Sequence, residues 1–170
     1  IASSTVTPDC ANAQFSVAID VTALGSGTPS ITDGTTTWPI AAVGVVNVGP
    51  FADGSSVSLT VLHGSDATCN LPLGSFTYSC PPANDDCANA IAISAMPYTN
   101  SQNASAATGP VVSTCAGMND GVWYTVVGNG ADIIVELSGV TGWDPEIGVY
   151  TGSCGTFTCV GSVDDDGTGG

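Results

Sequence analysis

Two clusters of carboxylate and amide side chains have the chemistry of a calcium site. Calcium takes about six to eight oxygen ligands from carboxylates, amides and carbonyls, and short acidic loops can supply them. One cluster follows a pair of prolines, and the other lies beside a glycine. Neither has the spacing of an EF-hand, so a solvated acidic loop is the alternative interpretation. The cluster residues are Asn84, Asp85 and Asp86, and Asp164, Asp165 and Asp166.

The other polar residues give little support to catalysis. Asp144 and Glu146 form a weaker calcium candidate, and a glycosidase would need such a pair inside a cleft rich in aromatic and polar groups. His63 is the single histidine, and no serine has the GxSxG surroundings of a nucleophile. The sequence therefore predicts that the chain is not an enzyme.

Two adjacent aromatic residues form a weak candidate binding site. Trp123 and Tyr124 lie in a predicted strand, where successive side chains point to opposite faces. Packing in the core is the favoured interpretation, and a ring that stacks on a carbohydrate is the alternative.

Seven cysteines in a chain rich in Gly, Ser and Thr are typical of a disulfide framework. Zinc is the rival interpretation, but there is a single histidine and no paired CxxC spacing. Hairpin spacing favours one local bridge, and the others would tie neighbouring strands together. The expected pairs are Cys154 with Cys159, Cys87 with Cys115 and Cys10 with Cys69, with Cys80 unpaired or joined to another chain.

The charge composition excludes two classes of partner. The chain has no Lys or Arg, and its formal charge is −15. Nucleic acids and anionic lipid headgroups are bound largely through Lys and Arg, so neither is an expected partner. No apolar run approaches the ~18 residues that span a bilayer, and no signal peptide is recognisable. We expect an extracellular protein whose targeting signals lie outside this segment.

Short alternating apolar runs, punctuated by Gly, Pro, Asn and Asp, predict an all-β chain. In the first half they suit an Ig-like sandwich, with Phe15, Val17, Ile19 and Val21 on one face of a strand. The strands predicted there are residues 14–21, 29–32, 40–48, 55–62 and 74–80.

Pro81 and Pro82 break any strand and predict a domain boundary, with an Ig-like domain at 1–81 and a second sandwich at 82–170. The second domain suits a jelly roll, but no strand follows its final acidic loop. Either the chain was cut there, or a neighbouring subunit completes the open sheet edge. The strands predicted in this half are residues 88–93, a strand near 111, 121–127, 132–137, 146–150 and 156–163.

Several motifs in the second half are similar to those of a known family. They are CPPANDDCANAI at 80–91, NDGVWYT at 119–125, WDPEIGVYTGSCG at 143–155 and the Cys159-Val160 pair. Together they resemble the prepeptidase-C-terminal-like β domains of giant surface proteins that Bacteroidota export by type IX secretion. The first half resembles, more loosely, the Ig-like repeats that accompany such domains. The resemblance implies a scaffold without catalytic residues, found in adhesins, filaments and accessory regions of secreted enzymes.

The residues and the resemblance lead to one expectation and one alternative. We expect a structural or adhesive module of a large secreted protein, part of a surface fibre, filament or cell-gripping appendage. Its partners would be copies of itself or neighbouring domains, with cell-surface glycans as possible targets and calcium as the one candidate cofactor. The alternative is a carbohydrate- or surface-binding accessory module of a secreted hydrolase.

Overall fold

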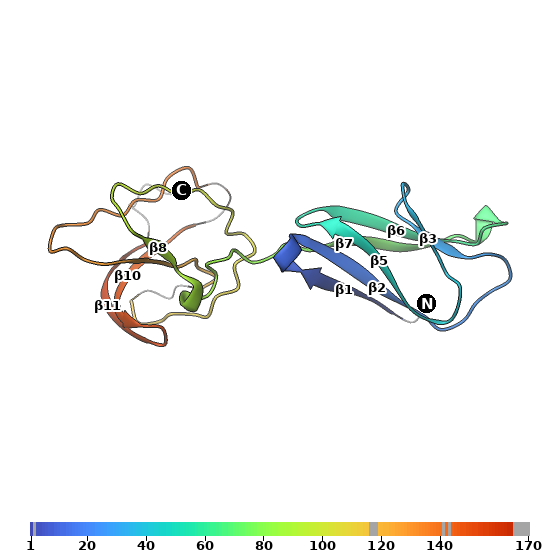
Figure 1. Ribbon diagram of the computed structural model, residues 1–170, viewed down its shortest axis with the longest axis horizontal. Helices are drawn as coiled ribbons and strands as arrows, with labels where there is room; N and C mark the ends of the chain where they lie inside the picture. The colour runs from blue at the N-terminus through green and yellow to red at the C-terminus, as the bar shows by residue number, and fades with distance from the viewer. Residues whose placement is uncertain (2, 116–118, 141, 143, 165–170) are drawn as a thin grey trace. The chain divides into compact units, whose positions relative to one another are not determined.

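The computed structural model describes residues 1, 3–115, 119–140, 142 and 144–164, and its chain divides into two compact units, Ile1–Cys80 and Pro81–Gly170. The prediction of an all-β chain is confirmed, because the described residues form strands and short 3-10 turns but no α-helix. Nor do these residues contain a helix with the length and apolar character needed to cross a membrane. Figure 1 shows the strands of each unit.

The first unit begins with a three-stranded antiparallel sheet. It contains β1 (Ser3–Asp9), β2 (Gln14–Val21) and β5 (Gly44–Ala52) in the order β1-β2-β5. Every second residue of β2 is buried, because alternate side chains of a strand point to opposite faces. The alternation read from the sequence in this strand is therefore confirmed, and its apolar face points into the core.

A second sheet of the first unit has the order β4-β3-β6-β7 and is also antiparallel. Its strands are β3 (Ser30–Thr32), β4 (Thr37–Pro39), β6 (Ser56–Leu62) and β7 (Leu71–Thr77). Asp33 and Gly34 provide the turn between β3 and β4, and Gly34 has a positive φ of 92° that glycine adopts without strain.

The two sheets of the first unit share one apolar core, and Figure 1 shows them as two layers. Burying one such side chain stabilises the fold by about 1.5 to 3 kcal/mol relative to leaving it exposed. The described residues of the first unit therefore bury large apolar side chains between its two sheets. The buried apolar residues are Phe15, Val17, Ile19, Val21, Ile31, Ile40, Val48 and Leu59.

Proline marks every outer strand of the first unit. The edge strands β1, β5, β4 and β7 contain Pro8, Pro50, Pro39 and Pro72, whereas the inner strands β2, β3 and β6 contain none. Proline has no N–H to donate to a ladder, so it is tolerated at sheet edges and hinders pairing with another chain. The first unit is thus protected against edge-to-edge association.

The second unit has smaller sheets. β8 (Ile91–Ile93) pairs in parallel with β9 (Tyr124–Val126), and β10 (Ile147–Ser153) forms an antiparallel hairpin with β11 (Thr156–Val163). Residues 132–137 were expected to form a strand, but they lie outside every sheet formed by the described residues.

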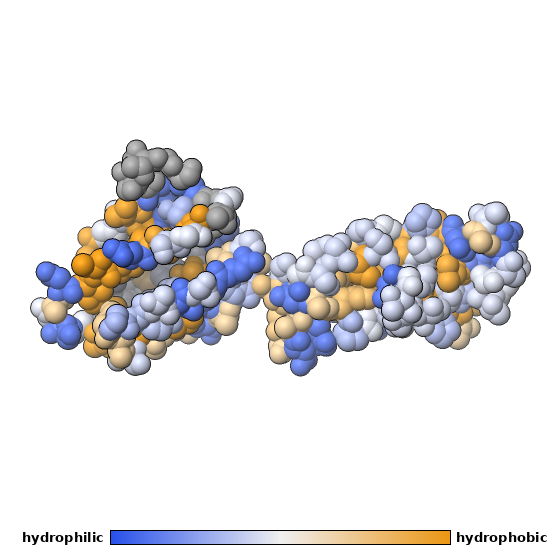
Figure 2. Space-filling model, turned by 90° about the horizontal axis from the view of Figure 1, so that it is seen from above, coloured by the Kyte–Doolittle hydropathy of each residue, from blue (hydrophilic) through white to orange (hydrophobic). Residues whose placement is uncertain are grey.

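Burial is also sparse in the second unit. Among its described residues, Asn84, Asp85, Ala107 and Gly109 are buried, so two of the four are polar side chains. Many apolar side chains remain exposed, and Figure 2 shows orange side chains gathered on the surface of this unit. The described part of the second unit therefore lacks an apolar core like that of the first.

Candidate functional site

The disulfide of the first unit joins Cys10 to Cys80, with a Cα–Cα distance of 5.6 Å. The predicted pairing of Cys10 with Cys69 is wrong. Cys69 precedes β7 and Cys80 follows it, so this strand of seven residues separates the two cysteines by roughly 20 Å. Cys80 lies at the end of β7 that is near Cys10, and Cys69 is free and exposed.

The second unit has two disulfides, and both fasten distant segments to the β10–β11 hairpin. Cys87 bonds to Cys154, and Cys115 bonds to Cys159. The predicted pairs Cys154–Cys159 and Cys87–Cys115 are therefore wrong, although all four residues are bridged. Cys154 lies in the hairpin turn, whereas Cys159 lies within β11 opposite Tyr150, so the two cysteines are separated along the hairpin.

Three disulfides within one chain indicate an oxidising environment, so the protein is secreted or extracellular. Each bridge closes a long loop, with sequence separations of 70, 67 and 44 residues. Such bridges stabilise a fold mainly by restricting the unfolded chain. In the second unit they compensate for the sparse apolar burial.

The start of the second unit is held by hydrogen bonds from Asn84 and Asp85. Asn84 Nδ2 donates to the Trp123 carbonyl at 2.9 Å, and the Trp123 amide donates to the Asn84 carbonyl at 2.8 Å. The Asp85 carboxylate accepts from the amide and the hydroxyl of Thr108, each at 2.7 Å. Both residues therefore act as tethers between segments far apart in the sequence.

The structure describes four of the six predicted calcium ligands. Asp86 and Asp164 are exposed, and Asp165 and Asp166 lie outside the described residues. No set of three or more Asp, Glu, His or Cys side chains in the described part of the chain has the geometry of a metal site. One oxygen, Asn84 Oδ1, is buried without a hydrogen-bond partner there. Calcium binding stays a prediction.

The two carboxylates of the weaker calcium candidate, Asp144 and Glu146, also differ in their surroundings. Asp144 is exposed, whereas Glu146 is half-buried and its Oε2 atom has no hydrogen-bond partner among the described residues. Burial, together with the negative charge of Glu146, raises the pKa of Tyr150 above its usual range. Glu146 thus acts electrostatically on the aromatic side chain that follows it in β10.

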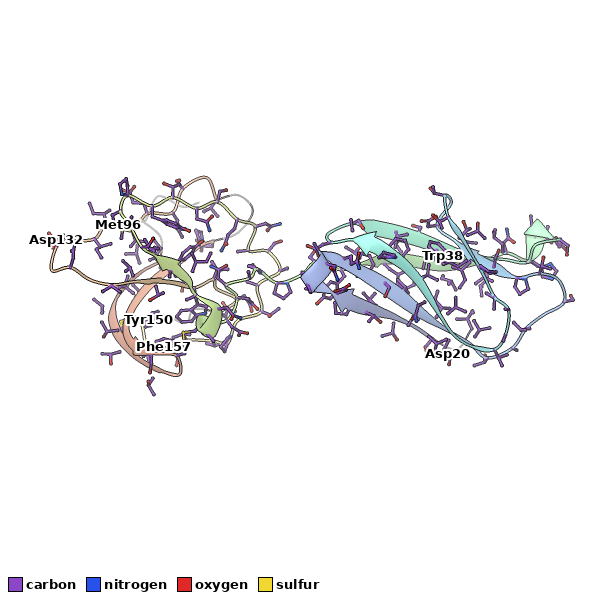
Figure 3. All side chains as sticks on the ribbon, viewed as in Figure 1. Asp20, Trp38, Met96, Asp132, Tyr150 and Phe157 are labelled. Atoms are coloured by element: carbon purple, nitrogen blue, oxygen red, sulfur yellow. A yellow bond between two sulfur atoms is a disulfide. The ribbon has the colours of Figure 1, made fainter. Side chains whose placement is uncertain are left out.

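Trp123 belongs to an aromatic cluster that the sequence reading did not anticipate. Its ring stacks on Phe157 with centroids 5.0 Å apart and planes 14° apart, and Tyr150 lies 5.3 Å from Phe157. Figure 3 shows Tyr150 and Phe157 beside each other on the hairpin. Each strand of the hairpin contains one aromatic residue, Tyr150 in β10 and Phe157 in β11, but their contact with Trp123 could not be read from the sequence.

A cleft of about 560 Å³ adjoins this cluster. Its walls include Trp123, Phe157, the Cys87–Cys154 disulfide, the Asp86 side chain and residues 110–114. Apolar rings beside a carboxylate and hydroxyl groups are the usual lining of a small-molecule or sugar site. The cleft is therefore a candidate binding site of the second unit.

Tyr124, the other predicted binding residue, has different surroundings. Its hydroxyl accepts a hydrogen bond from Asn100 Nδ2 at 2.8 Å, and its ring meets Tyr98 edge-on with centroids 6.3 Å apart. Tyr124 is 38% exposed. The two adjacent aromatic residues therefore do not form one platform, and Tyr124 does not line the cleft beside Trp123.

His63 lies in a turn just after β6. Its backbone amide donates to Asn70 Oδ1 at 3.0 Å, and Ser65 Oγ lies 3.3 Å from its Nδ1. These contacts link residues that are close in the sequence, which is typical of a local turn. His63 therefore lies at the end of a strand, and its contacts there are local.

Carboxylates of the first unit accept hydrogen bonds in turns, a role that the sequence reading missed. Asp33 Oδ1 accepts from the amides of Thr35 and Thr36, and Asp66 Oδ1 accepts from the amide and hydroxyl of Thr68. Hydrogen bonds from Thr36 and Thr35 lower the pKa of Asp33, and those from Thr68 lower the pKa of Asp66. An Asp two residues before Thr was the available signal.

No protein-family profile, no curated protein and no solved structure matches this chain.

Proposed function

We propose that this chain is a structural or adhesive module of a larger secreted protein. In this proposal the first unit is a closed, Ig-like spacer. The second, jelly-roll-like unit joins neighbouring domains or copies of the chain within a surface fibre, filament or cell-gripping appendage. The observation that carries the proposal is the contrast between a complete sandwich and a unit with sparse burial.

The first unit supports the role of a spacer. Its seven strands lie in two sheets around one core, an arrangement that Ig-like sandwiches share. Its edge strands carry proline, and the Cys10–Cys80 bridge fastens the start of the unit to its end. A module of this kind keeps its shape and does not pair laterally with its neighbours.

The second unit supports the role of a joining module. Its exposed apolar side chains include Val127, which is 91% exposed, and Ile134, which is 84% exposed. Large exposed apolar patches are typical of surfaces that another protein covers. We expect the unit to be stabilised when it is joined to a neighbour.

Electron microscopy of the purified chain, combined with sedimentation velocity, tests the proposal. Carboxylates repel one another strongly at low ionic strength and are screened within about 10 Å at 0.1 M salt. We expect oligomers or fibres in NaCl at about 0.15 M and dispersed chains at about 0.01 M. Chains that stay monomeric at every salt and calcium concentration would contradict the proposal.

The aromatic cleft favours a second candidate function, binding of carbohydrate as an accessory module of a secreted hydrolase. Trp123 supplies an apolar ring and Asp86 a hydrogen-bond acceptor on the walls of one cleft. A glycan array tests this with the variant Trp123→Phe, and Trp38→Phe in the first unit is the matched control. Glycan binding that Trp123→Phe weakens and Trp38→Phe leaves intact would favour the second candidate, and absence of any glycan binding would remove it.

A further inference from the structure

Residues 132–137 form an apolar segment in the second unit that no other described element covers. Four of its six residues are apolar, and all four are exposed: Ile133 at 41%, Ile134 at 84%, Val135 at 56% and Leu137 at 52%. These β-branched and aliphatic residues have high strand propensity, yet the segment lies outside every sheet that the described residues form. We call it the DIIVEL segment.

The DIIVEL segment also lacks the protection found in the first unit. Each edge strand there contains a proline, whereas the sequence between Pro110 and Pro145 contains none. Every residue of the segment can therefore offer both a backbone N–H and a C=O to a neighbouring strand. Exposed, proline-free apolar segments are templates for strand addition.

The two carboxylates of the DIIVEL segment determine which kind of strand can pair with it. In a paired strand alternate side chains share a face, so Asp132, Ile134 and Glu136 would lie on one side and the remaining residues on the other. Both carboxylates are exposed, and Figure 3 shows Asp132 at the outer end of a loop. Like charges directly opposite each other destabilise a pair of strands, and opposite charges stabilise it.

A second copy of the chain cannot supply the complementary charge. The sequence has no Lys or Arg, so no strand of a second copy carries a basic side chain that could face Asp132 and Glu136. A strand from a different polypeptide, or from a neighbouring domain with basic residues, can supply both. The required pattern is two basic side chains four residues apart, with a β-branched residue midway between them on the same face.

We propose that the DIIVEL segment is the docking site of a basic β-strand whose two Lys or Arg side chains face Asp132 and Glu136. This inference rests on the proposed role of the second unit in assembly and specifies the chemistry of its partner. The backbone would provide affinity through ladder hydrogen bonds, and the two charge pairs would select the partner and fix the register.

Three synthetic peptides test the proposal against the intact 170-residue chain, with affinity measured by fluorescence anisotropy. The matched peptide is rich in Val and Thr and carries lysines at positions i and i+4. Its isomer has the same composition but lysines at i and i+3, which places them on opposite faces of a strand. The third peptide has glutamates in place of the lysines. We expect the matched peptide to bind about tenfold more tightly than its isomer, because each exposed pair contributes modestly.

A charge-reversal variant tests the same contact from the side of the protein. Asp132→Lys combined with Glu136→Lys should reverse the preference, so that the glutamate peptide binds more tightly than the matched one. Asp144→Lys combined with Asp164→Lys is the control, because it makes the same change in net charge at two exposed sites of the same unit. The control should lower affinity for every basic peptide slightly and keep the order of the peptides.

Each outcome decides the proposal. Equal binding of the matched peptide and its isomer would overturn it in favour of general charge attraction. Absence of binding to any peptide would overturn it in favour of a segment without a basic partner. Fibres without peptide binding would contradict this inference alone, and peptide binding without any assembly would contradict the proposed function alone.

Discussion

Individual carboxylates of the first unit accept hydrogen bonds from nearby groups, in a chain that has no Lys or Arg. Asp9, Asp33 and Asp66 accept hydrogen bonds from nearby amides or side chains, and these bonds lower the pKa of each carboxyl group. Asp53 accepts from the amide of Cys80 at 2.7 Å, next to the Cys10–Cys80 disulfide. The first unit therefore uses its acidic residues to close turns.

These lowered pKa values predict an acid-sensitive first unit. A carboxyl group whose pKa is lower in the folded state stabilises the fold above its unfolded pKa, and the contribution is lost as pH falls through the folded pKa. Stability from Asp33 should therefore be constant near neutral pH and decline as the pH falls below about 3.9, the usual pKa of aspartate in an unfolded chain. Thermal melts between about pH 7 and pH 2 measure the effect.

The variant Asp33→Asn provides the control for that experiment. Asparagine keeps an oxygen that can accept from the amides of the turn but does not titrate in this range. Acid also relieves repulsion among all fifteen acidic residues, so the difference between the two melting curves, and not either curve alone, reports on Asp33. Parallel curves for wild type and Asp33→Asn would show that this turn does not contribute.

Among the elements, the edge strands of the first unit share one feature: each contains a proline, which has no backbone N–H to donate to a further strand. Pro72 lies in β7 opposite Thr60 of β6, where the ladder also shifts register. Replacing it restores a backbone N–H on a strand that has one free side.

We expect Pro72→Thr to increase association of the chain. The substitution places a residue with high strand propensity at an edge position and removes the obstacle to pairing. Sedimentation velocity at fixed salt should show a larger oligomeric fraction than in wild type. Pro110→Thr, in an exposed loop of the second unit, is the matched control and should leave the distribution unchanged. An unaltered distribution for Pro72→Thr would mean that other features protect this edge.

The disulfide of the first unit allows a quantitative prediction. Cys10→Ser combined with Cys80→Ser should lower the free energy of unfolding by about 2 to 4 kcal/mol, because the bridge restricts a long loop of the unfolded chain. Cys69→Ser should have almost no effect, since Cys69 is free and exposed. Urea denaturation followed by tryptophan fluorescence measures both. A loss for Cys69→Ser equal to that of the double variant would contradict the pairing.

The sequence predicted the elements that depend on a local residue pattern better than those that depend on pairing with another strand. The buried face of β2 could be read directly, because Phe15, Val17 and Ile19 alternate with small or polar residues. The short strand β4 was missed, because Thr37, Trp38 and Pro39 show no alternation and form a strand only through β3.

The disulfide partners could not be read from the sequence for a similar reason. Which cysteines meet depends on which strand ends lie together, and this is set by the sheet order. The same limit applies to the candidate site, where Trp123 was identified but its partner Phe157 was not.

At the scale of the whole molecule, the distribution of charge differs between the two units. Of the fifteen acidic residues, five lie in residues 1–80, so ten lie in residues 81–170. No basic residue offsets them, and each unit therefore carries net repulsion, which is greater in the second. The more acidic unit is also the one with sparse apolar burial, so its stability should depend more strongly on the medium.

We therefore predict that salt stabilises the second unit more than the first. Raising NaCl from about 0.01 M to about 0.5 M shortens the screening length from roughly 30 Å to a few ångströms and should weaken repulsion among ten carboxylates more than among five. Hydrogen exchange followed by mass spectrometry resolves the two units, and protection should rise mainly within residues 81–164.

CaCl2 at matched ionic strength separates screening from a specific site. Equal protection in both salts would mean that screening alone accounts for the effect, whereas extra protection confined to Asn84–Asp86 or to the region before Asp164 in calcium would assign a calcium site there. Protection that does not change with salt would contradict the view that repulsion limits the stability of the second unit.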